Sequence, residues 1–525
     1  MISYTSFAFF ILYFGATFVL YTIMPKKAKW CVLLVGSWAF YFIGAHGHVV
    51  PLIVSTLTVW AAGLGIQALE NRFKAKRKTV ERKERKVLKK QYNTYKSLVL
   101  ALGVILTLGL LLVCKYANFF IATGNTLFHT EWAEADIVQP LGISFYTLQA
   151  ISYLADVHRG KYEARKNPLR LSLYLSFMLT VVEGPIARYD QLGTELENPK
   201  PFSTKNVVYG AERVFWGLFK KIVIADRAAE FVRHVFDMEN EYTGVVVAAA
   251  ILFYTLQLYC EFSGIMDVMC GLAEMMGIKM PENFTRPFFA KSINEFWQRW
   301  HISLGSWLRD YIFYPISLSK PFKKLTKSAR KKQNPYYANL IPTAVALFFV
   351  WFGNGFWHGS GWKYIFYGLY YYVLMMIGLF LEPLFAKLCK ALRINRQSGA
   401  YRLFQMVRTF AIVNVGMCVF RADSVAHAWR LLISIVTNPN LKALLPGHGN
   451  GLELDMGDYV ILVLGTGIIF LVSLLQEKGV DIRARISRLP FVVKFIAFIL
   501  AAFVIIVFGA YGDGYGVVDL IYANF

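Results

Sequence analysis

Long apolar segments recur along the whole chain, separated by short polar or basic stretches. A helix needs about 17–25 apolar residues to cross a bilayer, and most of these segments approach or reach that length. Such segments predict transmembrane helices, because a helix satisfies its own backbone polar groups in lipid. The predicted spans are residues 7–24, 30–44, 49–69, 98–114, 340–351, 361–381, 403–419, 459–475 and 491–510.

The apolar pattern is irregular in the middle of the chain. Glycine and proline interrupt it at residues 140–142, 183–185 and 281–287. Broken backbone at membrane depth is tolerated where protein buries it or a water-filled cavity faces it, so we expect the functional site in this part. The predicted organisation is a single membrane domain made of N-terminal spans with a basic cytoplasmic loop at 1–97, a core at 98–425 and C-terminal spans at 426–525.

Composition supports the same class. Hydrophobic residues make up 56% of the 525 residues, and the mean hydropathy is +0.44. The net charge of +23 does not indicate nucleic-acid binding, because the basic residues gather in short loops between spans, as the positive-inside rule expects. We therefore predict an all-α, polytopic integral membrane protein with roughly ten or more spans. Its N-terminus is expected outside the cell.

Two basic segments stand out. Residues 72–96 hold about a dozen lysines and arginines against Glu81 and Glu84, and residues 320–332 are basic with no acidic residue. Both are predicted to be cytoplasmic loops, where they would attract anionic lipid or an acidic partner. The spacing of Phe296, Trp300, Trp307 and Tyr311 predicts an amphipathic helix over residues 292–314, too polar to face lipid.

Two histidines lie in long apolar segments. His358 is flanked by several glycines and by tryptophans, and His301 follows a tryptophan-rich stretch. Ionisable residues at membrane depth are functional candidates, and apolar surroundings favour a neutral imidazole that can accept a proton from a hydroxyl. For His358 the residues alone leave catalysis and a structural hydrogen bond open. For His301 they leave open orienting a substrate, polarising a carbonyl and bonding to the backbone.

Buried acids and cysteines are expected to be structural. Arginines are the predicted ion-pair partners of the acids Glu183, Glu261 and Asp267, since an unpaired carboxylate is costly in a membrane. The acids are matched with Arg188, Arg286, Arg299 or Arg309. The six cysteines form no CxxC pair, and no cluster of His, Cys or Asp has the spacing of a metal site. Nucleotide-binding loops and the nucleophile elbow of soluble hydrolases are absent as well.

Several segments resemble the signatures of membrane-bound O-acyltransferases, in particular their bacterial branch, which acts in alginate O-acetylation and in D-alanyl transfer to teichoic acid. The main matches are PENFTRPF at 281–288, EFWQRWHISL at 295–304 and FWHG at 356–359. Further matches, in the expected order, are PLGISFY at 140–146, EGPIARY at 183–189, YTLQ at 254–257, FSG at 262–264 and VFRA at 419–422.

The resemblance implies a fold and a site. The fold is a ring of tilted helices around a central cavity, where a cytoplasmic acyl donor and an extracellular acceptor meet. The catalytic histidine of the family corresponds to His358, and its other signature histidine to His301. Beside these two catalytic candidates, the residues expected to bind substrate are Trp297, Trp300, Arg299, Asn283, Trp357 and Ser303.

The predicted function is acyl transfer, most simply of acetyl, from a thioester to a cell-envelope or secreted polysaccharide, at the bacterial plasma membrane. The donor is expected to be acetyl-CoA or a phosphopantetheine carrier protein, with no permanently bound cofactor. A separate extracellular acyl-transfer protein is the expected partner, alongside the glycan acceptor and membrane lipid. D-alanyl transfer to teichoic acid, a transporter without chemistry and a covalent acyl-enzyme remain alternatives.

Overall fold

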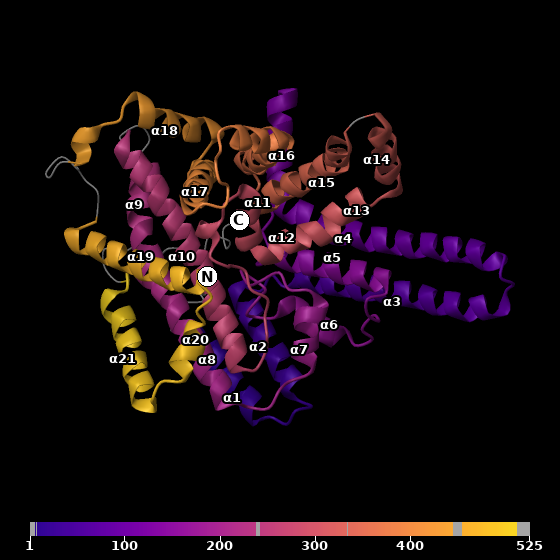
Figure 1. Cartoon of the computed structure of the whole chain (residues 1–525). Helices are drawn as coiled ribbons and strands as arrows, with labels where there is room; N and C mark the ends of the chain where they lie inside the picture. The colour runs from indigo at the N-terminus through magenta and orange to yellow at the C-terminus, as the bar shows by residue number, and fades with distance from the viewer. Residues whose placement is uncertain (1–5, 7, 238–241, 333, 445–453, 512–525) are drawn as a thin grey trace. The chain divides into compact units, whose positions relative to one another are not determined.

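A computed structural model describes residues 6, 8–237, 242–332, 334–444 and 454–511, and the chain there is helical (Figure 1). An isolated bridge between Phe284 and Trp300 is the sole pairing of extended backbone within these residues. The chain divides into two compact units. The first comprises residues 1–211 and 269–281, and the second comprises residues 212–268 and 282–525.

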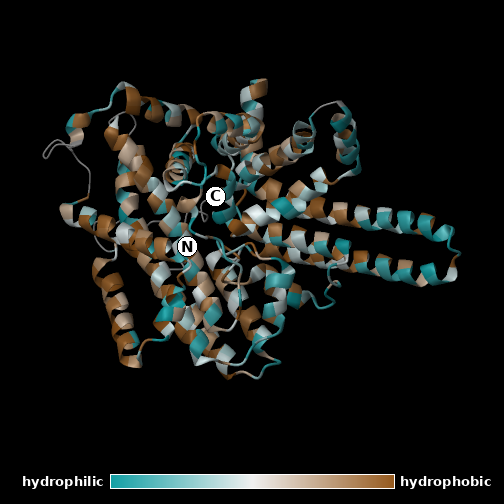
Figure 2. Cartoon of the chain, in the orientation of Figure 1, coloured by the Kyte–Doolittle hydropathy of each residue, from teal (hydrophilic) through white to brown (hydrophobic). Residues whose placement is uncertain are grey.

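The first unit is dominated by a long helical hairpin of α3 and α4, which run side by side (Figure 1). The outer ends of both helices are hydrophilic (Figure 2), and Lys96 forms an ion pair of 2.7 Å with Glu70 across them. The elements are η1 (Phe9–Gly15), α1 (Ala16–Ile23), α2 (Lys29–Gly44), α3 (Val50–Thr79), α4 (Glu84–Phe128), α5 (Ile143–Arg159), α6 (Pro168–Ser176), η2 (Tyr189–Gly193), α7 (Thr194–Glu197) and the first part of α8 (Thr204–Leu218).

The second unit carries both histidines and most of the long C-terminal helices. It also includes the end of α8 and most of α10. Its elements are η3 (Phe219–Ala225), α9 (Asp226–Asp237), α10 (Val245–Met275), η4 (Pro287–Phe289), α11 (Ile293–Arg299), α12 (Ile302–Leu308), η5 (Arg309–Phe313), α13 (Tyr314–Ser317), α14 (Lys320–Lys332), α15 (Pro335–His358), α16 (Trp362–Ala391), α17 (Gly399–Arg421), α18 (Val425–Thr437), η6 (Leu441–Leu444), α19 (Met456–Glu477), α20 (Ile482–Ser487) and α21 (Phe491–Phe508).

Eight helices in the described residues are long and apolar enough to cross a membrane. They are α3, α4, α10, α15, α16, α17, α19 and α21, and shorter apolar helices cover Phe9–Ile23, Lys29–Gly44 and Val425–Thr437. The predicted spans fall on these helices, although the predicted start at residue 7 lies outside the described residues. The sequence prediction missed α10, which is also long and apolar enough to cross a membrane. The protein is a multi-pass membrane protein. The predicted ring around a central cavity and the three-part domain boundaries stay predictions.

Non-helical backbone occurs where glycine and proline predicted it. Residues 140–142, 183–185 and 281–286 have no helix, and Gly142 precedes α5 with a left-handed φ of +66°. A Cβ on Gly142 would lie 1.8 Å from the carbonyl oxygen of Val181, so no other residue fits this close approach of two backbone segments. Two other predictions need correction. The basic segments 72–96 and 320–332, predicted as loops, are helical, the first as the ends of α3 and α4 apart from residues 80–83 and the second as α14. The helix predicted over 292–314 is broken.

Glycines allow α15 and α16 to pack closely and so fix the helix that carries His358. A Cβ on Gly355 would lie 2.2 Å from the carbonyl oxygen of Tyr364, and a Cβ on Gly368 would lie 2.2 Å from that of Trp351. Small residues let helix backbones approach in this way in membrane proteins. Gly355, one of the glycines that flank His358, therefore allows the backbone of α16 to approach closely.

Candidate functional site

His301 lies in a sharp turn that interrupts the predicted helix. α11 ends at Arg299, and the bridge between Trp300 and Phe284 pulls the chain into extended conformation. The flanking bonds join Thr285 N to the Arg299 carbonyl at 2.9 Å and Ile302 N to the Asn283 carbonyl at 3.0 Å. His301 then has φ +49° and ψ +49°, the left-handed region, before α12 begins. Such conformations cost about 1–3 kcal/mol outside glycine and cluster at functional sites.

Asn283 holds this turn from both its main chain and its side chain. Besides the carbonyl bond to Ile302, its Oδ1 accepts a hydrogen bond of 2.9 Å from the backbone N–H of Ser303. Its Nδ2 lies 3.1 Å from the Sδ of Met266 on α10. Asn283 and Ser303 are both buried. Both were predicted to bind substrate, and the contacts observed for Asn283 position the histidine turn.

His358 is the last residue of α15, and aromatic rings surround its imidazole. Its ring centroid lies 5.0 Å from that of Trp357, 5.4 Å from Phe420 and 6.1 Å from Tyr367. These neighbours come from α15, α16 and α17. Three helices therefore converge on the imidazole and restrict its orientation.

The structure brings the two histidines together. Their ring centroids are 6.3 Å apart, and both residues are buried, with His301 2% exposed and His358 4% exposed. Trp357 contacts both rings, since its ring also lies 5.7 Å from that of His301. His301 lies outside the eight candidate spans, and burial lowers its pKa well below the usual value, with a further contribution from His358. The imidazole of His301 is therefore uncharged at neutral pH.

The predicted tryptophans differ in their distance from the histidines. Trp357 touches both, whereas Trp297 packs on Trp351 and Tyr371 with centroid distances of 5.2 and 4.9 Å. The buried Nε1 of Trp297 has no hydrogen-bond partner within the described residues. Trp300 stacks on Phe296 at 5.5 Å. Trp357 thus forms the wall of the histidine pair, and Trp297 and Trp300 form the aromatic layer that supports it.

The main contacts of Arg299 are ion pairs within the protein. Its guanidinium forms ion pairs of 2.7 Å with Glu295 and 3.0 Å with Glu477, and Arg286 pairs with the same Glu477 at 2.7 Å. Because Glu477 is the last residue of α19, these pairs tie α11 to a C-terminal span. The prediction that Arg299 binds substrate is not tested by these contacts.

The partners predicted for two buried acids were wrong. Glu261 pairs with Lys221 at 3.1 Å, and Asp267 pairs with Lys220 at 2.6 Å and with Arg213 at 2.8 Å. Lys221 also reaches Asp226 at 2.6 Å. Arg286, Arg299 and Arg309 instead pair with Glu477, Glu295 and Asp310. Ion pairing as such was predicted correctly for Glu261 and Asp267, and Glu183 is buried in the first unit.

Lys220 and Lys221 are the residues that the sequence prediction missed. They lie in η3, a π-helical turn that continues α8, and both are buried. The available signal was a pair of lysines inside the apolar stretch 214–225, where charged residues are costly and so pair inward. They neutralise Glu261 and Asp267 and lock α10 against η3.

Comparisons with known proteins agree on one family. The family model described as MBOAT, membrane-bound O-acyltransferase, matches residues 164–330. A probable alginate O-acetylase AlgI of Pseudomonas aeruginosa is 30% identical over 88% of this chain and 80% of the relative. A peptidoglycan O-acetyltransferase of Helicobacter pylori is 30% identical over 67% of each chain. A teichoic acid D-alanyltransferase of Bacillus subtilis is 29% identical over 56% of this chain and 71% of the relative.

Proposed function

The chain belongs to the membrane-bound O-acyltransferase family, and from this premise we propose that it moves acetyl groups from a cytoplasmic thioester to a cell-envelope or secreted polysaccharide. The observation that carries the proposal is the buried pair of His301 and His358, whose ring centroids are 6.3 Å apart. The names of two relatives, an alginate O-acetylase and a peptidoglycan O-acetyltransferase, support the acetyl group and the glycan acceptor.

In the proposed reaction His358 acts as general base. Its neutral imidazole takes the proton of the acceptor hydroxyl while the hydroxyl oxygen forms a bond to the thioester carbonyl carbon. The carbon–sulfur bond then breaks, and the departing thiolate takes the proton back from the imidazole. The products are an O-acyl ester and a free thiol. General-base catalysis of this kind contributes about 10²–10⁴-fold in rate.

Positioning and the exclusion of water complete the proposed mechanism. The left-handed turn presents His301 beside His358, where it orients the donor carbonyl or the acceptor. Trp357 packs on both imidazoles and keeps water from the thioester. The aromatic layer of Trp297 and Trp300 fixes this arrangement. Acyl transfer through a transient acyl-enzyme is a variant of the same proposal.

The proposed donor is acetyl-CoA or an acylated phosphopantetheine carrier, both of which are anionic. The basic helix α14 carries six lysines and one arginine without an acidic residue, and it would raise the local concentration of either donor. An extracellular acyl-transfer protein is the proposed partner that receives or delivers the acyl group outside.

The test is acetyl transfer by purified protein from acetyl-CoA to a soluble glycan acceptor, with His358→Ala against the wild type. Transfer should fall by about 10²-fold or more. His427→Ala is the matched control, since His427 is also buried in the second unit but contacts Asp423 at 3.6 Å. A His358→Ala protein that folds and retains a third or more of wild-type transfer overturns the assignment of the base.

D-alanyl transfer is the second candidate, because one matched relative is a teichoic acid D-alanyltransferase. Offering D-alanyl-loaded carrier protein and acetyl-CoA in parallel assays decides between the two acyl groups. A transporter without chemistry would bind the donor but release no thiol, and its His358→Ala variant would bind equally well. Thiol release from either donor excludes that alternative.

A further inference from the structure

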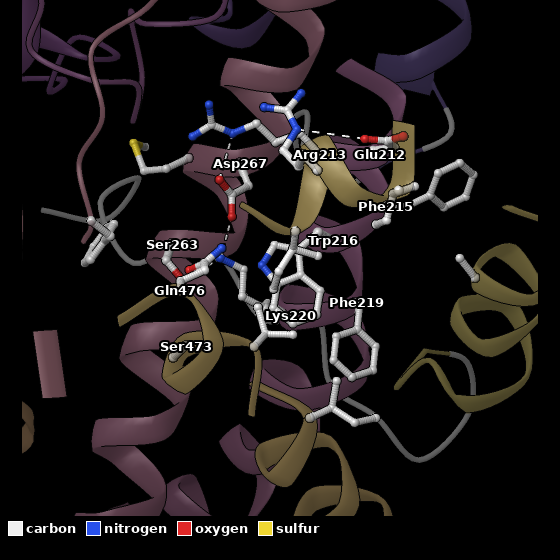
Figure 3. Close-up of a pocket in the computed structure, with 18 of the residues that line it drawn as sticks. Glu212, Arg213, Phe215, Trp216, Phe219, Lys220, Ser263, Asp267, Ser473 and Gln476 are labelled. Carbon is white, nitrogen blue, oxygen red and sulfur yellow. Dashed lines mark hydrogen bonds and ion pairs between the residues drawn. The ribbon is translucent and has the colours of Figure 1, made fainter. Parts of the chain in front are cut away.

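A cavity of about 1040 Å³ lies within the second unit, and the two histidines are not among its lining residues (Figure 3). Its size is at the upper end of the roughly 300–1,000 Å³ of ordinary small-ligand sites. Its walls come from α8 with η3, from α10, from the segment 282–286 that also holds the His301 turn, from α19 with the segment into α20, and from α21. Four helices thus leave a space where close packing is the norm in protein interiors.

One side of the cavity is apolar and helical in pattern. On α21 the lining residues include Ala497, Ala501, Val504 and Ile505, which share one helical face. Leu500 also lines the cavity and is 57% exposed. The opposite face of α21 is strongly apolar as well, and the helix is brown along its length in Figure 2. Both faces of α21 are therefore apolar, and the face that lines the cavity suits an apolar ligand.

Charged residues in the inner wall are neutralised by one another. Asp267 lies between Arg213 and Lys220, and Lys220 also donates to the Ser263 hydroxyl at 2.9 Å (Figure 3). Arg213 pairs in addition with Glu282. This network holds the wall together. Because its two basic and two acidic side chains balance, the network has no net charge, and a ligand here needs no opposite charge.

The wall from residues 479 to 494 includes two basic side chains, Arg483 and Lys494, beside the acidic Asp481. Lys494, in the first turn of α21, lines the cavity, and its Nζ donates to the Ser487 carbonyl at 3.4 Å. Within the described part of the chain no carboxylate lies within ion-pair distance of this Nζ. Arg483 also lines the cavity, and its Nε lies 3.9 Å from Glu212, at the limit of an ion pair. An anionic group beside Lys494 would therefore meet the positive charge of its ammonium group.

The dimensions fit a lipid tail. From Lys494 to Ile505 the helix rises by roughly 16 Å, at 1.5 Å per residue. The candidate spans α19 and α21 both contribute to the wall, so the cavity borders the bilayer. We propose that this cavity binds an anionic phospholipid, with one acyl chain along α21 and its phosphate on Lys494.

The test measures lipid retention by native mass spectrometry of protein purified from bacterial membranes in mild detergent. Ala501→Trp fills the cavity from α21, and Ala502→Trp is the matched control on the same helix, because Ala502 does not line the cavity. Wild type and Ala502→Trp should retain phosphatidylglycerol, and Ala501→Trp should lose it by tenfold or more. Ala497→Leu repeats the test with a smaller side chain if Ala501→Trp does not fold.

A titration tests the charge separately. Delipidated protein is titrated with phosphatidylglycerol and with phosphatidylcholine of the same chain length. Lys494→Gln should reduce the preference for phosphatidylglycerol about fivefold, the effect of one basic residue near an anionic lipid, and Lys390→Gln on exposed α16 should not. Equal retention by Ala501→Trp and Ala502→Trp, or displacement of the lipid by acetyl-CoA, overturns the proposal.

Discussion

The imidazoles of His301 and His358 lie with their ring centroids 6.3 Å apart, although His301 has a left-handed backbone conformation in a turn and His358 ends a long helix. We expect His301→Asn to separate the backbone role of His301 from its chemical role. Asparagine tolerates left-handed φ, so the turn should persist while the imidazole is lost. Transfer activity should then fall at least tenfold with little change in thermal stability. The kcat and KM for acetyl-CoA, with a thermal melt, provide the measurement.

Arg393→Asn is the control for this variant. Arg393 also has a positive φ, of +54°, but it lies on an exposed turn after α16. The Arg393→Asn variant should keep both wild-type activity and wild-type stability. If His301→Asn keeps wild-type kcat and KM, the imidazole of His301 has no part in the reaction.

Asn283→Ala should weaken the turn that carries His301. It leaves the buried N–H of Ser303 without its acceptor at 2.9 Å, and an unsatisfied buried donor costs about 1–3 kcal/mol. Both thermal stability and kcat should fall. Asn283→Asp keeps an oxygen at the same place and should restore part of both, as measured by melting in detergent and by transfer assays.

Asn339→Ala serves as the comparison, because Asn339 also accepts through its side chain, from Arg330, but at an exposed site. Its effect should stay within about 0.5 kcal/mol. If Asn283→Ala only raises the KM, with an unchanged melting temperature, Asn283 is instead a substrate contact.

Gly368→Ala should push α15 and α16 apart. Its Cβ would lie 2.2 Å from the Trp351 carbonyl, and backbone cannot yield cheaply, so a loss of about 1–3 kcal/mol is expected. Because His358 ends α15, transfer activity should fall as well. Gly378→Ala on the same helix meets nothing within 4 Å and should gain about 0.5–1 kcal/mol. Equal melting temperatures of the two variants would contradict the close packing.

Lys221→Met should be strongly destabilising. It leaves Glu261, which is fully buried, and Asp226 without their cation, and breaking a buried pair costs about 3–5 kcal/mol. The double variant Lys221→Met with Glu261→Gln should recover part of the loss. Lys200→Met removes an exposed ion pair with Glu195 and should cost about 1 kcal/mol at most. Melting of all three variants in the same detergent decides the outcome.

Replacing Lys323, Lys324, Lys327 and Lys331 of α14 by glutamine should raise the KM for acetyl-CoA at low salt, because the helix would no longer attract the anionic donor. The difference from wild type should shrink as salt increases. An unchanged salt dependence of kcat/KM in the variant argues against α14 as the docking element.

Sequence periodicity and motif order determined a good part of this protein. The apolar runs placed the long helices, since length and hydropathy suffice for a span, and the segments around His301 and His358 indicated the family. Breaks at glycine and proline were also predictable, because these residues restrict backbone conformation locally.

Tertiary structure decided the rest. The periodicity of residues 292–314 favoured one helix, but a bridge from Phe284 and two hydrogen bonds from the distant segment 283–285 broke it at His301. Likewise, Glu261 pairs with Lys221 of η3, and Asp267 pairs with Lys220 of η3 and with Arg213, rather than with the arginines predicted from the sequence. Spans and motifs follow from local sequence, whereas partners and turns depend on which segments meet in space, because pairing energy depends on distances that a linear sequence does not contain.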